Sequence, residues 1–344
     1  MNEIRKDYLL NRWVVIAADR GLRPTDLGKS VLEQPKKKTI CPFCPGNEHI
    51  TPPSVLTYIR SENLLIKTHD QGSSRIKDWE IRVVPNLYPA FSISPSYNNK
   101  SLTEKNPDIL KAVGHHEVVI ESPIHDEHPA NAKLTRLIYV IQAYHDRIHE
   151  LSQKSYVKYI SIFRNHGLEA GASLSHPHSQ IISMPMIPRI VQEELDNSRI
   201  FWKKTSQCKF CDILAREIDG PRFIWRNKDF IVFSPRAGVN PLEFWIVPTR
   251  HMSSLLKITK TEIKNLAKTL KITLQGLHEL IPSVSYNYAF HTTFDDESSE
   301  YYHWHLEVYP KLSTYGGFEK STGVYINTVS PEIAADMLRT KIIH

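Results

Sequence analysis

Short runs of apolar residues recur along the chain and predict a protein rich in β-strands. An apolar run of roughly four to eight positions between turn-forming residues is typical of a strand buried on at least one face. The sequence contains runs of this kind at 81–84, 117–121, 159–163, 180–184, 230–233, 244–247, 286–290 and 306–309. The segment 10–20 is also predicted to hold a buried strand, which runs into a basic loop. Several of them are separated by segments long enough to hold a helix.

Two longer segments carry apolar residues in steps of three and four, the period of an amphipathic helix. The first covers about 130–151, and the second begins after Thr259 and ends before Pro282. Thr259 and Glu262 have the spacing of a capping box, which marks a helix start. A shorter polar segment at 190–197 is also predicted to be helical. The apolar stripes comprise Leu134, Leu137, Ile141, Tyr144, Ile148 and Leu151, and then Ile263, Leu266, Leu270, Leu274, Leu277 and Ile281.

The second half of the chain repeats the order of the first: a cysteine pair, strands, a histidine, a helix, a strand, His-x-His and a final strand. His176 follows His125 by 51 positions, and His303 follows His251 by 52. Both intervals contain a helix and end on His-x-His, so we infer an internal duplication. The fold class we expect is α+β, with two related halves that each form an antiparallel sheet with packed helices.

Composition restricts the class of protein. The chain has 344 residues, of which 41% are hydrophobic and 23% charged, which suits an ordinary globular protein. No apolar run approaches the roughly 20 residues that cross a membrane, and the N-terminus lacks the apolar segment of a signal peptide. We therefore expect a cytoplasmic protein with no membrane partner. The modest net charge of +6 suits an anionic small substrate, and no single basic face points to DNA or RNA.

The four cysteines form two C-x-x-C pairs, which favour metal over disulfides in a chain without a secretion signal. Structural zinc usually takes four Cys or His ligands in a tetrahedron. The duplication therefore predicts two zinc ions. In the first half, His115, His116 and His128 are rival ligands. The two expected ligand sets are Cys41, Cys44, His125 and His176, and Cys208, Cys211, His251 and His303.

The motif His176-Pro177-His178 with Gln180 carries the candidate chemistry. In an extended backbone His176, His178 and Gln180 point to one side, and Pro177 stiffens the link. If a metal takes His176, His178 is left free. A hydrogen bond at one ring nitrogen would then let the other attack phosphorus, while Gln180 donates to a phosphoryl oxygen. The alternatives are that both histidines bind one metal and that Gln180 is a strand-surface amide.

Two further segments suit phosphate binding. The glycines between Asn165 and Ser173 allow backbone N–H groups to approach an anion closely. Arg20 and Arg23 flank a turn after a buried strand, where fork-like guanidinium donors can hold a phosphate. Without other context, solvated surface arginines are the simpler interpretation of this pair.

Several of these motifs, in this order, resemble the galactose-1-phosphate uridylyltransferase family of the histidine-triad superfamily. The resemblance covers nearly the whole chain and implies two histidine-triad-like domains, 1–195 and 196–344, in a homodimer. It implies that His178 takes a nucleoside monophosphate from a nucleotide sugar of the UDP-glucose type and passes it to a hexose-1-phosphate such as galactose-1-phosphate. The residues that would contact nucleotide and phosphates are Arg20, Arg23, Asn86, Asn165, Ser173 and Gln180. The matching motifs are Cys41-Pro-Phe-Cys44, Pro85-Asn86-Leu87-Tyr88-Pro89-Ala90, Ser122-Pro123-Ile124-His125, Phe163-Arg164-Asn165-His166-Gly167, His176-Pro177-His178-Ser179-Gln180 and Pro248-Thr249-Arg250-His251.

Three departures make the chain similar to the ADP-glucose phosphorylase branch, which transfers adenylyl to inorganic phosphate. Ser179 stands where the sugar transferases usually have glycine, and the segment 317–327 lacks their Gly-Tyr-Glu pattern for the hexose. The third departure is the second Cys and His set. The transferases can instead hold a second metal through a Glu and histidines; the matching positions are Glu194, His291, His305 and Glu307, the last departing from His.

Two rival functions make different predictions. A hydrolase would use water as the acceptor and release the nucleotide without any added phosphate compound. A zinc-containing nucleic-acid-binding protein would bind a polynucleotide with a steep salt dependence. That second idea leaves His178 and Gln180 without a role.

Overall fold

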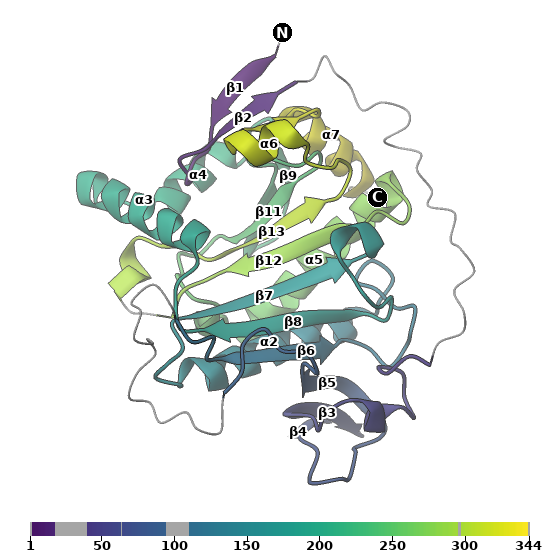
Figure 1. Cartoon of the computed structure of the whole chain (residues 1–344). Coiled ribbons are helices and arrows are strands. Elements are labelled where there is room, and N and C mark those ends of the chain that lie inside the picture. Colours follow the sequence, from purple (N-terminus) through teal and green to yellow (C-terminus); the bar gives the residue numbers. More distant parts are fainter. Residues whose placement is uncertain (1, 18–39, 63, 94–109, 295–296, 343–344) are drawn as a thin grey trace.

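A large antiparallel sheet forms the centre of the molecule (Figure 1). The computed structural model describes residues 2–17, 40–62, 64–93, 110–294 and 297–342, and within them this sheet has 11 strands. The strand order is β4-β3-β5-β6-β8-β7-β12-β13-β11-β10-β9. The strands are β3 (Leu56–Ser61), β4 (Leu64–Thr68), β5 (Trp79–Pro85), β6 (His115–Ile120), β7 (Tyr159–His166), β8 (His178–Met184), β9 (Phe223–Arg226), β10 (Phe230–Phe233), β11 (Phe244–Pro248), β12 (Tyr286–His291) and β13 (His305–Pro310).

The order of strands within the sheet repeats, which agrees with the duplication expected from the sequence. In the first half the order is β3-β5-β6-β8-β7, and in the second it is β9-β10-β11-β13-β12. In each half, counted along the chain, a helix connects the third of these five strands to the fourth: β6 to β7 in the first half and β11 to β12 in the second. The strands β7 and β12 lie at the inner ends of the two halves and pair with each other, with Asn165 opposite Asn287. This pairing joins the halves.

Those two connecting helices, α2 (Leu134–Ser152) and α5 (Lys260–Leu280), cover one face of the sheet side by side (Figure 1). Their apolar stripes enter one core that continues across both halves, so the halves share it. That core includes Ile141, Tyr144, Ile162, Ile181, Val232, Leu266, Leu270, Tyr288 and Leu306. The expected capping box is present: the Thr259 side chain accepts from the Glu262 N–H, and the Glu262 carboxylate accepts from the Thr259 N–H.

The opposite face of the sheet is covered by helices over the second half. Here α3 (Arg189–Thr205) and α4 (Lys209–Glu217) pack Leu195 and Phe210 against Ile231, Phe233 and Trp245. On the first half the same face carries the half-buried side chains of Gln180, Ile182 and Asn165. Because side chains alternate along a strand, this leaves alternate residues of β8 pointing away from the shared core.

A small sheet brings the two ends of the described chain together. The strands β1 (Glu3–Lys6) and β2 (Trp13–Ile16) form a hairpin. The strand β14 (Tyr325–Asn327), near the other end of the chain, adds to it by pairing parallel with β2. The last helices are α6 (Gly317–Thr322) and α7 (Pro331–Ile342), and α7 packs on α5. Residue 195, the expected domain boundary, lies inside α3.

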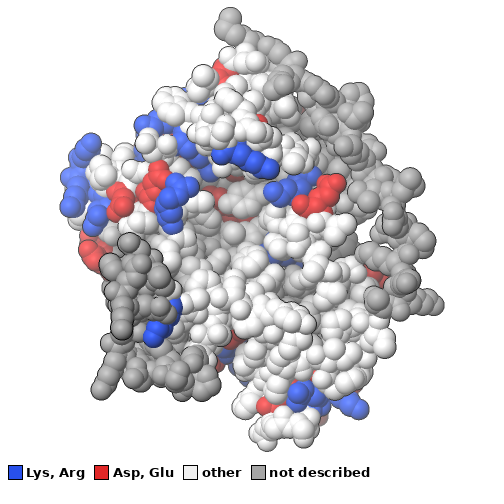
Figure 2. All heavy atoms as spheres, viewed as in Figure 1, with Lys and Arg blue, Asp and Glu red and all other residues white. Residues whose placement is uncertain are grey.

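Charges are mixed on the surface. On the face drawn in Figure 2, Lys and Arg are interspersed with Asp and Glu, and the described residues form no broad basic area there. None of the helices in the described part of the chain has both the length and the apolar character needed to cross a bilayer.

Candidate active site and metal centres

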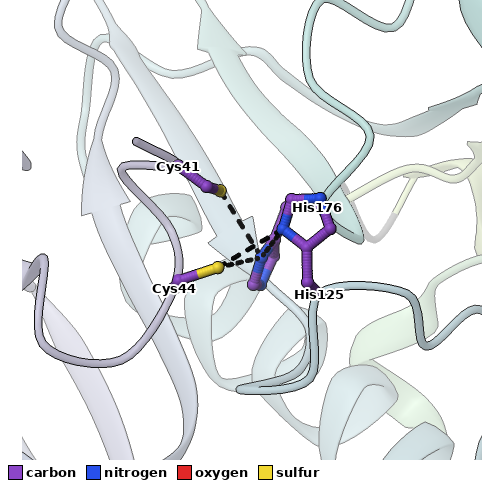
Figure 3. A group of neighbouring side chains, drawn as sticks. All are labelled: Cys41, Cys44, His125 and His176. Atoms are coloured by element: carbon purple, nitrogen blue, oxygen red, sulfur yellow. Dashed lines mark hydrogen bonds between the residues drawn. The ribbon is translucent and has the colours of Figure 1, made fainter. Parts of the chain in front are cut away.

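The first expected metal group comes together from three separate segments. Cys41 and Cys44 lie in a loop before β3, His125 lies in the loop after β6, and His176 lies just before β8. All four side chains point toward one another (Figure 3). The Cys44 Sγ is 3.3 Å from His125 Nδ1 and 3.6 Å from His176 Nδ1, and the two Nδ1 atoms are 3.4 Å apart.

These separations fit one tetrahedral ion. With Zn–S near 2.3 Å and Zn–N near 2.0 Å, the edges of a tetrahedron are about 3.5 Å for S···N and about 3.3 Å for N···N. Burial, together with the neighbouring Cys41 thiol, raises the pKa of Cys44 to about 11. The thiolate form that a metal needs is therefore favoured only when a cation occupies the centre. His125 and His176 also have Nε2 partners, Ser175 Oγ at 3.1 Å and the Ser122 carbonyl at 2.7 Å.

The second expected group is also assembled. Cys208 and Cys211 stand at the start of α4, and the Cys211 Sγ lies 3.5 Å from His251 Nδ1 and 3.8 Å from His303 Nδ1. The His251 Nε2 is 2.8 Å from the Ser299 carbonyl, which fixes the ring as Ser122 fixes His176. The ligand atoms of this group also lie within 4.8 Å of one another.

The Glu and His positions considered as an alternative to this second group form a third, separate cluster. Glu194, His291, His305 and Glu307 are all buried and share no residue with either Cys and His group. They also bind one another directly: His291 Nδ1 is 2.9 Å from Glu194, and His305 Nε2 is 3.1 Å from Glu307. Burial opposes the charge of His291, but the two carboxylates outweigh it and raise its pKa to about 9. The two second-site arrangements are therefore compatible in one chain.

The rival histidine ligands have other partners. His115 Nε2 is 2.8 Å from the Tyr156 hydroxyl, and the His128 ring lies 5.5 Å from that of His166 and 5.2 Å from that of His278, centre to centre. His116 faces Gln180. In the described part of the chain, none of the three lies in a group of possible metal ligands.

His178 has the geometry of a nucleophile with a fixed tautomer. Its side chain is 7% exposed, and its Nδ1 is 2.8 Å from the backbone carbonyl of His176. Because that carbonyl can only accept, Nδ1 carries the proton and Nε2 carries the lone pair. Burial lowers the pKa of His178 and the nearby charge of Arg164 lowers it further, so the ring is neutral near pH 7.

The start of β8, where this histidine lies, is held by the residue that follows β6 and by a buried polar network. The N–H of Glu121 donates to the Pro177 carbonyl at 3.1 Å, and the Glu121 carboxylate forms an ion pair with Arg164. The Tyr144 hydroxyl lies 3.1 Å from that carboxylate and 2.7 Å from the Ser179 hydroxyl. Ser179, which departs from the transferase pattern, is therefore part of this network.

Three of the expected substrate-binding residues are amides whose oxygen atoms are engaged by the protein. Gln180 Oε1 faces His116, Asn165 Oδ1 accepts from Asn287, and Asn86 Oδ1 accepts from a backbone N–H in its own loop. The amino groups of Gln180 and Asn165 are therefore left to donate, whereas Asn86 Nδ2 lies 3.1 Å from His116 Nε2. The positions of His116 and Asn287 as partners were not expected from the sequence.

Of the remaining expected residues, Ser173 lies in the adjacent glycine-rich loop. Ser173 is exposed in this loop, which turns at Gly167 and Gly171 with φ of 83° and 85°. A Cβ at Gly167 would lie 2.1 Å from the Ser285 hydroxyl, so only glycine fits there. Arg20 and Arg23 lie outside the described residues.

Comparison with known proteins gives the family. A family model described as the N-terminal domain of galactose-1-phosphate uridyl transferase matches residues 1–188, more than half of the chain. The chain belongs to this family. A model described as a domain of unknown function matches residues 126–344.

Relatives match over nearly the whole length. An ADP-glucose phosphorylase from Arabidopsis thaliana is 33% identical over 98% of this chain and 92% of its own. A galactose-1-phosphate uridylyltransferase from Thermotoga maritima is 30% identical over 98% of both chains.

Two solved structures have the same fold. The crystal structure of an Arabidopsis ADP-glucose phosphorylase with bound ADP-glucose has a TM-score of 0.80, at 32% identity over 98% of this chain and 99% of its own. A uridylyltransferase structure has a TM-score of 0.75, at 27% identity over 100% and 99%. The α+β fold and the family expected from the sequence are therefore confirmed.

Proposed function

We propose that this family member transfers a nucleoside monophosphate from a nucleotide sugar to a phosphate acceptor through a covalent bond to His178. One observation carries the proposal: the His178 Nδ1 is bound to the His176 carbonyl, which leaves the lone pair on Nε2. The amides of Gln180, on the same strand, and Asn165, on the neighbouring strand, have their oxygen atoms held by other side chains. The substrate class comes from the relatives, one named an ADP-glucose phosphorylase and the other a galactose-1-phosphate uridylyltransferase.

In the first step, the His178 Nε2 attacks the phosphorus atom next to the nucleoside. The N–P bond forms, the bond to the bridging oxygen breaks, and hexose-1-phosphate leaves with the electron pair. The ring becomes a cation, which the hydrogen bond from Nδ1–H to the His176 carbonyl stabilises. In the second step, an acceptor phosphate oxygen attacks the same phosphorus and the N–P bond breaks, which restores the neutral ring.

Donor groups around the phosphates assist both steps. We propose that the amino groups of Gln180, Asn165 and Asn86 donate to phosphoryl oxygens where negative charge develops, because the oxygen of each amide has a partner within the protein. We assign Ser173, Arg20 and Arg23 to the same role from the resemblance.

Each Cys and His group is proposed to hold one structural zinc ion. A bound zinc ion would tie the loops of Cys41, His125 and His176 together and so fix the backbone carbonyl that orients His178. We also propose a cytoplasmic location: the four cysteines are free and lie with histidines, and the cytoplasm keeps thiols reduced. A homodimer is proposed from the resemblance alone.

The acceptor distinguishes two members of this reaction class. The first candidate is transfer of uridylyl from UDP-glucose to a hexose-1-phosphate such as galactose-1-phosphate. The second is transfer of adenylyl from ADP-glucose to inorganic phosphate. The second is favoured by the resemblance to the ADP-glucose phosphorylase branch at Ser179 and in the Cys208 group, where the chain departs from the transferases.

Intact-mass measurement tests the covalent step. The protein is mixed separately with UDP-glucose and ADP-glucose without acceptor and denatured under mildly alkaline conditions, which preserve a phosphoramidate. We expect a mass gain of one uridylyl or one adenylyl group, which also names the base. Adding galactose-1-phosphate or inorganic phosphate before denaturation should remove the group and identify the acceptor.

The His178→Asn variant should keep its fold and metal and show no mass gain. His149→Asn, on the exposed side of α2, is the matched control and should react like the wild type. Substantial transfer by His178→Asn would disprove the nucleophile. Release of nucleotide from the wild type without any acceptor would instead indicate a hydrolase.

A further inference from the structure

The hydrogen bonds around Gln180 determine which way its amide faces. The backbone N–H of Ala90 lies 3.1 Å from His116 Nδ1, and a backbone N–H can only donate. Nδ1 of His116 must therefore accept, which puts the ring proton on Nε2. That proton faces Gln180 Oε1 at 2.7 Å. The amide oxygen is thus held by His116, and the amino group of Gln180 is turned away from it.

The neighbouring Asn86 does not alter this assignment. Its Nδ2 lies 3.1 Å from His116 Nε2, but its Oδ1 accepts from the Tyr88 N–H at 2.9 Å, so the atom near His116 is an amino group. Two donors cannot bond each other, and the oxygen of Gln180 is the nearer partner of Nε2. The amino group of Asn86 is therefore also left to donate elsewhere.

The same reasoning applies to Asn165, from a separate set of contacts. Asn287 Nδ2 lies 2.8 Å from the Ala170 carbonyl, so it is an amino group. The same atom lies 2.8 Å from Asn165, which must present its oxygen there. The Asn165 amino group then faces the glycine-rich loop, 3.7 Å from the point that a Cβ on Gly171 would occupy.

We propose that His116 and Asn287 are positioning residues for the transfer reaction, because they hold the oxygens of Gln180 and Asn165 and present the two amino groups to the phosphates. This inference rests on the proposed function. A freely rotating amide can turn either end toward the phosphates, and it must be fixed with its amino group there before it assists, because its oxygen repels an anion. Asn287 belongs to β12, so the second half of the chain contributes to the site of the first.

Two substitutions of His116 separate hydrogen bonding from packing. In His116→Gln, the amide nitrogen can reach the position of Nε2 and donate to Gln180. In His116→Asn, the shorter side chain reaches only the position of Nδ1, so Gln180 loses its partner. Asn287→Asp tests the second contact, because a carboxylate only accepts and Asn165 must turn its amino group toward it.

The readout is the rate of nucleotidyl-protein formation in a single turnover at saturating UDP-glucose or ADP-glucose, followed by intact mass. Loss of one donor to developing phosphoryl charge costs about 100- to 1,000-fold, and an amide that is only released should lose less. We expect His116→Asn and Asn287→Asp to react about 10- to 100-fold more slowly. His116→Gln should stay within about threefold, and the concentration for half-saturation should change little in all three.

The possible outcomes separate the two proposals. Wild-type speed in His116→Asn would overturn the positioning role and leave the proposed function intact. Equal loss in His116→Gln and His116→Asn would also overturn it, because packing would then explain both. No adduct in the wild type would overturn both proposals. Ring nitrogen chemical shifts of His116 give an independent check: they should report a proton on Nε2, and a proton on Nδ1 would contradict the assignment.

Discussion

Replacement of Glu121 by glutamine would leave the Arg164 guanidinium in the interior without a counter-charge. The Glu121 and Arg164 side chains are 4% and 2% exposed, so water cannot take over the lost partner. Removing one partner of a buried ion pair costs about 3–5 kcal/mol, because the remaining charge stays desolvated. We therefore expect Glu121→Gln to reduce the free energy of unfolding by about 3–5 kcal/mol at pH 7.

Urea denaturation followed by tryptophan fluorescence measures this loss from the shift in midpoint at unchanged slope. Asp212→Asn is the control, because its partner Arg216 is 64% exposed and such pairs contribute at most about 1 kcal/mol. Replacing Glu121 and Arg164 together with apolar residues should restore part of the stability, since no unpaired charge remains. A loss in Glu121→Gln no larger than in the control would refute the argument from burial.

Three other changes test separate parts of the molecule. Cys41→Ser should reduce the zinc content measured by elemental analysis from two ions per chain to one and lower the melting temperature; two retained ions would contradict the ligand set. Thr259→Ala removes the capping box of α5 and should cost about 1 kcal/mol in urea denaturation, whereas no loss would mean that the cap contributes nothing. Burial of Asp146 opposes its charge, but interactions with His145 and Lys67 outweigh it and hold its pKa well below the usual value. The stability that this carboxylate contributes is present above about pH 4 and is lost as the pH falls. The difference in unfolding free energy between wild type and Asp146→Asn should therefore shrink in acid; a constant difference would disprove the role of the charge.

Local periodicity was sufficient to predict the elements that pack into the core. The stripes of α2 and α5 were readable because one face of each helix is buried, and the apolar runs of β7, β8, β10, β11, β12 and β13 were readable for the same reason. The metal groups could be proposed because the duplication repeats their spacing. The two matching intervals, from His125 to His176 and from His251 to His303, can be counted in the sequence without any knowledge of the tertiary structure.

Other features depend on pairing between distant segments and left no local signal. In β4 apolar and polar residues do not alternate clearly enough to predict a strand, and Leu64 and Ile66 are exposed at the edge of the sheet. β14 forms through its partner β2, more than 300 positions away. The His116 contact with Gln180 follows from the antiparallel pairing of β6 and β8. Without that register, His116 was only one of three possible metal ligands.

The junction of β7 and β12 also governs how the chain can be divided. A fragment that ends after α3 would contain the whole His-Pro-His motif and the first Cys and His group, yet it would expose β7 as an unpaired edge. Such an edge is a template for association with other chains. A gene for the first half alone should therefore yield aggregates or a swapped dimer, and the two halves should be recoverable as soluble protein only when expressed together.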